Sequence, residues 1–206
     1  MVENHKTAQT KTARTKRAIQ TALISLINTK GLPNVTVSDL SQTADINRGT
    51  FYLHYEDKFD LVNQLETTIL VQIEHILDHH LAGPVGLVID NPQQRQPLEQ
   101  AIYEICLLIS QNFALIKALL SPEGDPYLPG KITKLLQNYL GLDKVLQRYH
   151  LRIPTNYAEA IIVQSLVDII NIWLQEEQPR SPQEITQIIL VSRFFSPYGL
   201  IEKDIK

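Results

Sequence analysis

The sequence predicts an all-α protein, and three observations support that class. Apolar residues recur every three or four positions through each long segment between the glycine- and proline-rich stretches, which is the spacing of one helix face. Thr36 with Asp39, and Ser181 with Glu184, have the spacing of a capping box at a helix start. The chain shows no strand pattern. We therefore expect an N-terminal unit of three helices followed by a larger helical domain.

The composition is that of a globular protein with one or two domains. The chain has 206 residues, of which 44% are hydrophobic and 20% charged. No uninterrupted apolar run reaches the ~18 residues of a membrane span, and the polar N-terminus lacks the apolar core of a signal peptide. The one cysteine, Cys106, excludes an internal disulfide and fits a reducing cytoplasm. Its neighbours are apolar, so we expect a buried packing residue.

The first helix is expected to begin near residue 14. Residues 1–13 are polar, lack periodicity and are predicted to be a disordered basic tail. Residues 14–30 carry apolar side chains at helical spacing, and Gly31 ends the segment. This amphipathic helix would pack across the two short helices that follow.

Residues 35–61 predict three helices separated by two abrupt turns. Thr36, Asn47 and Asp57 each stand where a side-chain oxygen would cap a helix. Asp45 stands in the first turn, where a residue that tolerates the left-handed conformation is needed. Two short helices joined in this way form a helix-turn-helix, whose second helix enters the major groove of DNA.

The second helix carries the residue types that this role requires. Arg48 can bind guanine or a phosphate, and Thr50 offers a hydroxyl and a methyl group. Gly49 removes side-chain bulk, and Lys58 opens the third helix where it would meet a phosphate. The residues that we predict to contact DNA are Thr36, Ser38, Asn47, Arg48, Gly49, Thr50, Tyr52, Leu53, His54 and Lys58.

The stretch resembles the DNA-binding domain of the tetracycline-repressor (TetR) family of transcriptional regulators. The family's threonine, turn, Gly-Thr-Phe-Tyr, aromatic and lysine positions are matched by Thr36, residues 44–46, residues 49–52, Tyr55 and Lys58. Asp45 and Ser41 stand where the family usually has glycine and alanine. The resemblance implies a dimeric DNA-binding protein, most often a repressor, with Tyr52 and Lys58 on phosphates.

The charge distribution agrees with a separate DNA-binding end. Residues 1–61 have a net charge of +2, whereas the rest of the chain has −5. A basic end on an acidic body is typical of a nucleic-acid reader with a second domain. We expect a DNA-binding domain over residues 14–56 and a ligand-binding and dimerisation domain over residues 57–206. The basic tail has an alternative role as an arm along the DNA.

The larger domain is predicted from helical spacing and from its breaks. A long helix is expected from Asp57 to about Ala82, a loop over residues 83–97, helix over 98–120 with a break near Gln111, a loop over 121–130, and helix over 131–150. His75 and His79 have the i, i+4 spacing of metal ligands, but no third ligand is identifiable, so we expect no metal site and no cofactor.

The two last helices predict a dimer interface. Residues 155–175 are apolar around nearly the whole circumference, which favours burial on two sides. The capping box at Ser181 opens a final helix beside it, and two such helices form a symmetric four-helix interface between subunits. The TetR resemblance implies the same interface. The residues expected in it are Ile161, Ile162, Ser165, Leu166, Ile169, Ile188 and Phe195.

A small effector is expected in the helical body, because the family usually binds one there. The candidate lining residues are Tyr103, Cys106, Phe113, Tyr127, Tyr139 and Trp173, each of which could equally fill core or interface. Residues 153–187 also resemble a TetR subgroup that includes regulators of dihydroxyacetone metabolism. Some of its members are co-activators without their own ligand response, and that alternative stays open. A helical protein-interaction module and an enzyme are more remote alternatives, since no nucleophile or phosphate-binding motif is present.

Overall fold

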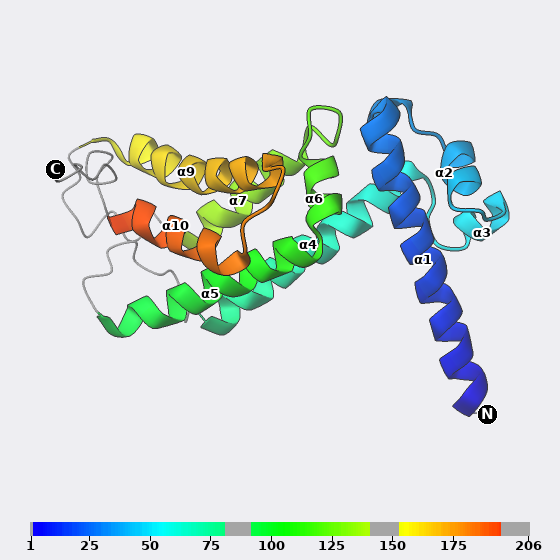
Figure 1. The fold of residues 1–206 in the computed structure, drawn as a ribbon, viewed down its shortest axis with the longest axis horizontal. Coiled ribbons are helices and arrows are strands. Elements are labelled where there is room, and N and C mark those ends of the chain that lie inside the picture. Colours follow the sequence, from blue (N-terminus) through cyan, green and yellow to red (C-terminus); the bar gives the residue numbers. More distant parts are fainter. Residues whose placement is uncertain (1, 81–91, 141–152, 195–206) are drawn as a thin grey trace. The chain divides into compact units, whose positions relative to one another are not determined.

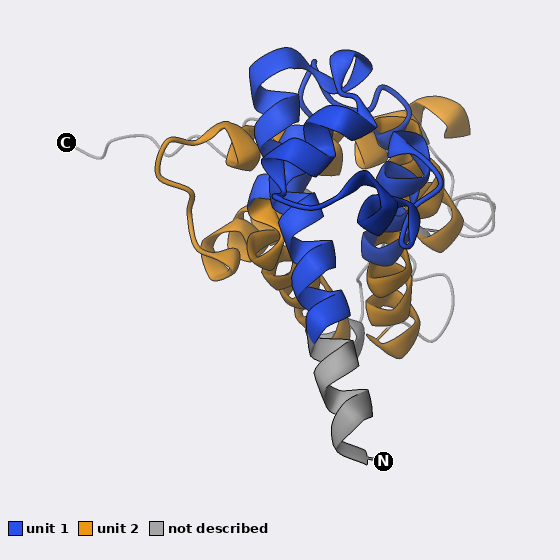
Figure 2. Ribbon diagram, turned by 90° about the vertical axis from the view of Figure 1, so that its right-hand side faces the viewer, with its two compact units in different colours: residues 1–69, 114–128 blue, residues 70–113, 129–206 orange. Residues whose placement is uncertain are grey.

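The protein is helical throughout the part of the chain that the structure describes. The structure is a computed structural model that describes residues 2–80, 92–140 and 153–194, with side chains for all of these except residues 2–10, 92–95, 140, 159 and 193–194. Within these ranges there is no strand, which confirms the all-α class (Figure 1). The chain forms two compact units: residues 1–69 with 114–128, and residues 70–113 with 129–206 (Figure 2).

Unit 1 contains the predicted short helices. It consists of α1 (Val2–Lys30), a 3-10 turn η1 (Leu32–Asn34), α2 (Val37–Thr43), α3 (Arg48–Tyr52), the first half of α4 (Lys58–His80) and most of α6 (Phe113–Leu119). Because α1 begins at Val2, residues 2–13 are helical in the structure. The side chains of residues 1–10 lie outside the described residues. The disordered tail and the proposed domain boundaries stay predictions.

The core of unit 1 explains how such short helices hold together. The apolar face of α1 is buried, and α1 contacts α2, which contacts α3. Leu40 of α2, Phe51 of α3 and Leu61 of α4 are each 0% exposed. Full burial of one such side chain contributes about 1.5–3 kcal/mol, so each short helix is anchored by one large residue.

Unit 2 consists of α5 (Pro92–Gln111), α7 (Leu128–Leu140), α9 (Thr155–Gln175), α10 (Pro182–Phe194) and the second half of α4. Helix α10 packs against α5 and α9. Leu77 of α4, Ala101 of α5 and Leu135 of α7 form a separate buried cluster, with partly buried apolar side chains around it. The capping box that opens α10 is present, because Ser181 Oγ accepts from the Glu184 amide and the Glu184 carboxylate accepts from Ser181 N–H at 2.8 Å.

Two predicted boundaries need correction and one is confirmed. The loop expected to run to Pro97 ends earlier, since α5 starts at Pro92 and includes Pro97. A proline near a helix start removes one backbone hydrogen bond, which the apolar face that follows outweighs. Helix α7 likewise starts at Leu128, inside the loop expected over residues 121–130. The break near Gln111 is confirmed, because α5 ends there and α6 begins at Phe113. The segments 81–91 and 141–152 lie outside the described residues.

Helix α9 could cross a membrane by its length and composition alone. Of its most apolar stretch of 18 residues, 24% is buried within the chain. Its outward apolar side chains therefore require a cover other than this chain. The exposed members on α9 and α10 are Tyr157, Ile161, Ile172, Ile188 and Val191.

Candidate nucleic-acid interface

The start of α2 is fixed by a capping box. The Asp39 amide donates to Thr36 Oγ1 at 3.2 Å, and the Asp39 carboxylate accepts from Thr36 N–H at 2.8 Å. Lys30, the last residue of α1, donates to the same carboxylate at 2.5 Å. The Lys30 and Thr36 hydrogen bonds lower the pKa of Asp39 from 3.8 to about 2. One carboxylate thus joins the end of α1 to the beginning of α2.

The turn into α3 is closed by two residues that the sequence analysis singled out. Asp45 has a φ of 53°, which is the left-handed conformation predicted for it. Asn47 Oδ1 accepts from Gly49 N–H at 2.8 Å and caps α3, also as predicted. Because that oxygen is committed to the cap, Asn47 presents its NH2 group rather than its carbonyl to a base.

The outward surface of α3 is polar at its start and carries large side chains at its end. Asn47, Arg48 and Gly49 are exposed and Thr50 is half-buried. Tyr52 and Leu53 are 58% and 81% exposed. Phe51 points inward, and its ring lies 5.6 Å from that of Tyr55, which is also buried. The single inward residue leaves the rest of this helix free for DNA.

Lys58 has a different local role from the one expected. Its ammonium donates to the backbone carbonyls of Leu32 at 3.0 Å and Pro33 at 2.8 Å, so it ties the first turn of α4 to η1. Asp57 caps α4 as predicted, accepting from the Phe59 and Asp60 amides at 2.8 Å. The phosphate contact proposed for Lys58 stays a prediction, and the residue has a structural function in the absence of DNA.

The η1 turn is held on a second side by the segment after α6. Leu32 N–H donates to the carbonyl of Glu123 at 2.8 Å. Gly31 has a φ of 77°, which favours glycine, and a Cβ added there would lie 2.7 Å from a Glu123 carboxylate oxygen. The sequence contains no signal for this contact, since it joins residues that are far apart in the chain.

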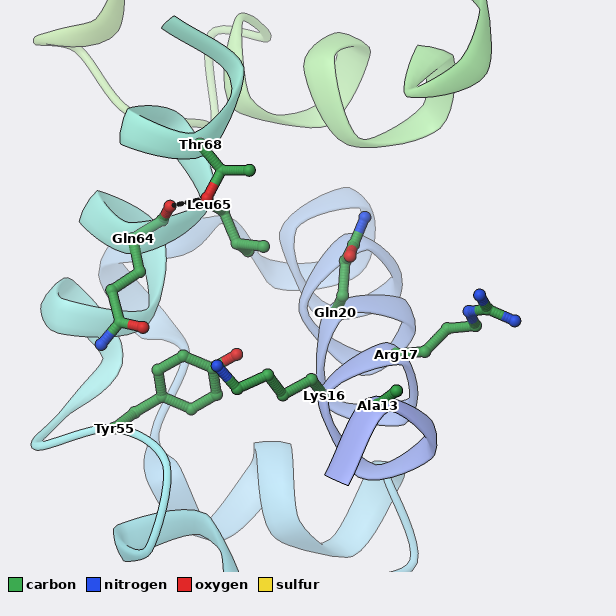
Figure 3. Close-up of a pocket in the computed structure, with 8 residues that line it drawn as sticks. All are labelled: Ala13, Lys16, Arg17, Gln20, Tyr55, Gln64, Leu65 and Thr68. Carbon is green, nitrogen blue, oxygen red and sulfur yellow. Dashed lines mark hydrogen bonds between the residues drawn. The ribbon is translucent and has the colours of Figure 1, made fainter. Parts of the chain in front are cut away.

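A groove of about 240 Å³ lies between α1 and α4 in unit 1 (Figure 3). The Tyr55 ring forms part of its wall, and Lys16 extends over that ring with its ammonium 5.8 Å from the ring centroid. Arg17 is at the rim and points away from the groove. None of the six residues proposed to line an effector pocket belongs to this groove.

The six proposed pocket residues lie in different surroundings. Cys106 is buried, and burial raises the pKa of its thiol to about 11, so the thiol stays protonated. Trp173 is 1% exposed, stacks edge-on with Phe113 at 5.6 Å and donates to the Arg180 carbonyl. Tyr127 is 75% exposed.

The remaining two pocket candidates are half-buried. Tyr103 accepts a hydrogen bond from Gln183 of α10 at 3.1 Å. Tyr139 borders the buried Leu77 cluster, and burial together with Asp78 raises the pKa of its hydroxyl. A ligand-lining role for all six stays a prediction.

The proposed interface residues are distributed over exposed and half-buried positions of α9 and α10. Ile161 and Ile188 are exposed, and Ser165, Leu166 and Ile169 are half-buried, as is Ile162. Phe195 lies outside the described residues. His75 and His79 are exposed, and no group of three metal-ligating side chains occurs among the residues that the structure describes.

The fold and the capped, outward-facing α3 define a helix-turn-helix DNA-binding regulator. Residues 19–65 match the pattern described as "Bacterial regulatory proteins, tetR family", and residues 96–192 match a "Transcriptional regulator C-terminal region" of the same family. The chain belongs to the TetR family of DNA-binding transcriptional regulators, which is a non-enzymatic family.

Individual relatives agree with this assignment. The chain is 25% identical over 168 residues to the uncharacterized HTH-type transcriptional regulator YxbF of Bacillus subtilis (strain 168), and the match covers 80% of this chain and 42% of that protein. It therefore spans less than half the length of that relative.

Two solved structures share the fold. One is a TetR transcriptional regulator from Streptococcus agalactiae 2603V, with a TM-score of 0.57, 23% identity, and coverage of 91% of this chain and 97% of the other. The second is the regulator FadR from Bacillus subtilis in complex with stearoyl-CoA, with a TM-score of 0.56, 19% identity, and coverage of 84% and 95%.

Proposed function

We propose that the protein is a repressor that binds a near-palindromic operator as a homodimer and is released by a small effector. The surface of α3 carries this proposal, because it presents Arg48 and Thr50 outward from a helix whose start is capped and whose single anchor is buried. Arg48 and Thr50 are assigned to base edges. Thr36, Ser38, Tyr52 and Lys58 are assigned to phosphates.

The homodimer is supported by the apolar side chains on α9 and α10. Ile161 and Ile172 are 62% and 66% exposed, and their spacing of eleven residues places them on one face of α9. Ile188 and Val191 are exposed on α10. A second copy of the pair would cover these side chains in a four-helix interface. Each subunit would contribute one reading head, which we define as residues 36–61. Two reading heads per dimer would then require two half-sites in successive major grooves.

The effector site is assigned to unit 2, beside the apolar cluster of Leu77, Ala101 and Leu135 against which Tyr139 packs. Apolar walls with a few polar groups are the usual composition of a ligand site. The fold relative from Bacillus subtilis is recorded with stearoyl-CoA, so long-chain acyl-CoA molecules are the first class to test as effectors. A co-activator without its own ligand response is the alternative.

Operator selection followed by binding measurements tests the proposal. Genomic fragments retained by the protein should share a near-palindrome, and the protein should bind it as a dimer. Arg48→Ala should cost about 1–3 kcal/mol per half-site at one base position and relax discrimination there. The matched variant Lys58→Ala should weaken binding to all DNA sequences by a similar factor.

Two results would decide against parts of this account. If Arg48→Ala weakened binding equally for every base at every position, Arg48 would be a phosphate contact, and base reading would be assigned to Asn47, Thr50 or His54. Operator binding that no acyl-CoA or other small molecule releases would favour the co-activator alternative.

A further inference from the structure

The outer surface of α1 is strongly basic, and the reading head described above does not use it. Between Asn4 and Ser38 the sequence has six lysines and arginines and no carboxylate. Four of these cations lie within residues 11–17 of α1, and we call them the α1 basic cluster: Lys11, Arg14, Lys16 and Arg17. All four are exposed.

Two other cations of the protein are compensated by ion pairs, in contrast to this cluster. Lys30 at the end of the same helix pairs with Asp39, and Arg180 of unit 2 pairs with Glu176. Among the described residues, no carboxylate pairs with any member of the α1 basic cluster. The nearby Asp60 accepts from the Gln64 amide and from Glu56 N–H instead. An unneutralised group of cations on one helix favours a polyanionic partner.

The geometry of the cluster offers contacts at two depths. Lys11, Arg14 and Arg17 are three residues apart and share one face of α1. The Arg17 guanidinium points outward, whereas Lys16 lies across the buried Tyr55 ring at the groove between α1 and α4 (Figure 3). The outer residues can follow a strand of phosphates while Lys16 holds one phosphate at the groove.

We propose that the α1 basic cluster binds backbone phosphates that flank the base pairs read by α3. This inference rests on the proposed operator binding and extends it. Helix α1 belongs to unit 1 and contacts α2, so the cluster is fixed relative to the reading head. The cluster belongs to the N-terminal half of α1, and this helix continues past α3 toward its N-terminus (Figure 1), so we expect the cluster to meet phosphates beside the half-site.

A double variant and a matched control separate the cluster from general charge effects. Arg14→Gln with Arg17→Gln removes two positive charges from the outer face of α1. Lys134→Glu, at an exposed position of α7 in unit 2, lowers the net charge by the same two units. Glutamine and glutamate have helix propensities similar to those of arginine and lysine, so both proteins should fold with unchanged helicity and unfolding midpoint. A single Lys16→Gln variant tests the groove.

Binding is measured on two operator duplexes, one ending at the half-sites and one extended by flanking base pairs, over a range of salt concentrations. On the extended duplex the α1 double variant should bind about tenfold more weakly, and its log–log salt slope should fall by about 0.9 for each phosphate that the variant no longer neutralises. Lys16→Gln should weaken binding to the same duplex by a smaller factor. The control variant should have the affinity and the salt slope of the wild type on both duplexes. On the short duplex the wild type and the α1 variant should bind alike.

The outcomes distinguish this inference from the proposed function. Wild-type protein that shows no sequence-specific binding to any selected fragment would overturn the operator proposal itself. Specific wild-type binding with an α1 variant that retains the wild-type affinity and salt slope on the extended duplex would overturn only the present inference. That second result would leave the cluster to an acidic protein partner. Equal weakening on both duplexes would also overturn it, because the effect would then not come from the flanks.

Discussion

The reading head, residues 36–61, and helix α9 are stabilised in opposite ways. In the reading head each of three helices is started by a side-chain oxygen, from Thr36, Asn47 or Asp57, and the two short ones are each anchored by one large buried apolar residue, Leu40 or Phe51. Helix α9 has no side-chain cap at its start and leaves large isoleucines exposed. The first region is complete within one chain, whereas the second is complete only when something covers it.

The difference teaches where each region is vulnerable. A capped helix of two turns depends on single hydrogen bonds of about 1 kcal/mol each. Association through an apolar face of two helices depends on the apolar area that is buried, and a charge at the centre of that face is not tolerated. Substitutions in the reading head should therefore change stability in small steps, while those on α9 should change assembly all at once.

The largest effect is expected from a charge on the exposed face of α9. Ile161→Glu with Ile172→Glu should convert a dimer into a folded monomer, since both side chains are exposed in the single chain. Without the second reading head, operator binding should weaken on the order of 100-fold or more. Sedimentation measures the assembly, and Val71→Glu, which alters an exposed apolar residue of α4, is the control. A double variant that stays dimeric would show that the interface lies elsewhere.

The next effect concerns backbone packing in the turn after α6. A Cβ at Gly124 would lie 2.2 Å from the backbone oxygen of Leu119, so Gly124→Ala should lower the free energy of unfolding by about 1–3 kcal/mol. The control is Gly130→Ala, whose Cβ would meet nothing within 4 Å and which should stabilise α7 by up to about 1 kcal/mol. Urea unfolding of both variants measures the contrast. Equal stabilities would mean that this turn adjusts without cost.

A smaller effect of opposite sign is expected inside the reading head. Ser41 is buried, and within the described residues its Oγ has no hydrogen-bond partner. Ser41→Ala removes an unsatisfied hydroxyl, so it should raise the free energy of unfolding by about 1 kcal/mol. Ser25→Ala on the exposed side of α1 should change it by less than about 0.5 kcal/mol. A destabilised Ser41→Ala protein would imply that the hydroxyl is hydrogen-bonded.

The smallest effect is a pH dependence of the α1–α2 junction. Hydrogen bonds from Lys30 and Thr36 lower the pKa of Asp39 from 3.8 to about 2. The stabilisation is therefore complete above the unfolded pKa and is lost as the pH falls from about 4 to 2. Asp39→Asn should flatten stability over that window in thermal unfolding. An unchanged pH profile would assign the acid sensitivity to other carboxylates.

These two regions also explain how far the sequence alone was informative. The caps at Thr36, Asn47 and Ser181 and the left-handed Asp45 are confirmed, because each depends on residues no more than three positions apart. The carbonyl partners of Lys58 are 25 and 26 residues away, and the contact of Leu32 with Glu123 joins two stretches of sequence that no local pattern connects. Long-range contacts of this kind were not predictable.

The proposed site shows the same division. The sequence placed Arg48, Thr50 and Tyr52 on one short helix, which the structure confirms. It also grouped six aromatic and thiol residues as one pocket, yet Tyr127 is exposed while Trp173 is buried against Phe113. Residue type identifies which side chains can line a cavity, but only packing between distant helices decides which of them do.

The short length of α3 has a thermodynamic consequence for the encounter with DNA. A helix of five residues has almost no stability as an isolated segment, so its existence depends on the Asn47 cap and the Phe51 anchor. The ordering entropy of this segment is therefore already lost before an operator arrives. Calorimetry should show a modest heat-capacity change on operator binding, without the large negative value that accompanies folding of a disordered segment on its target.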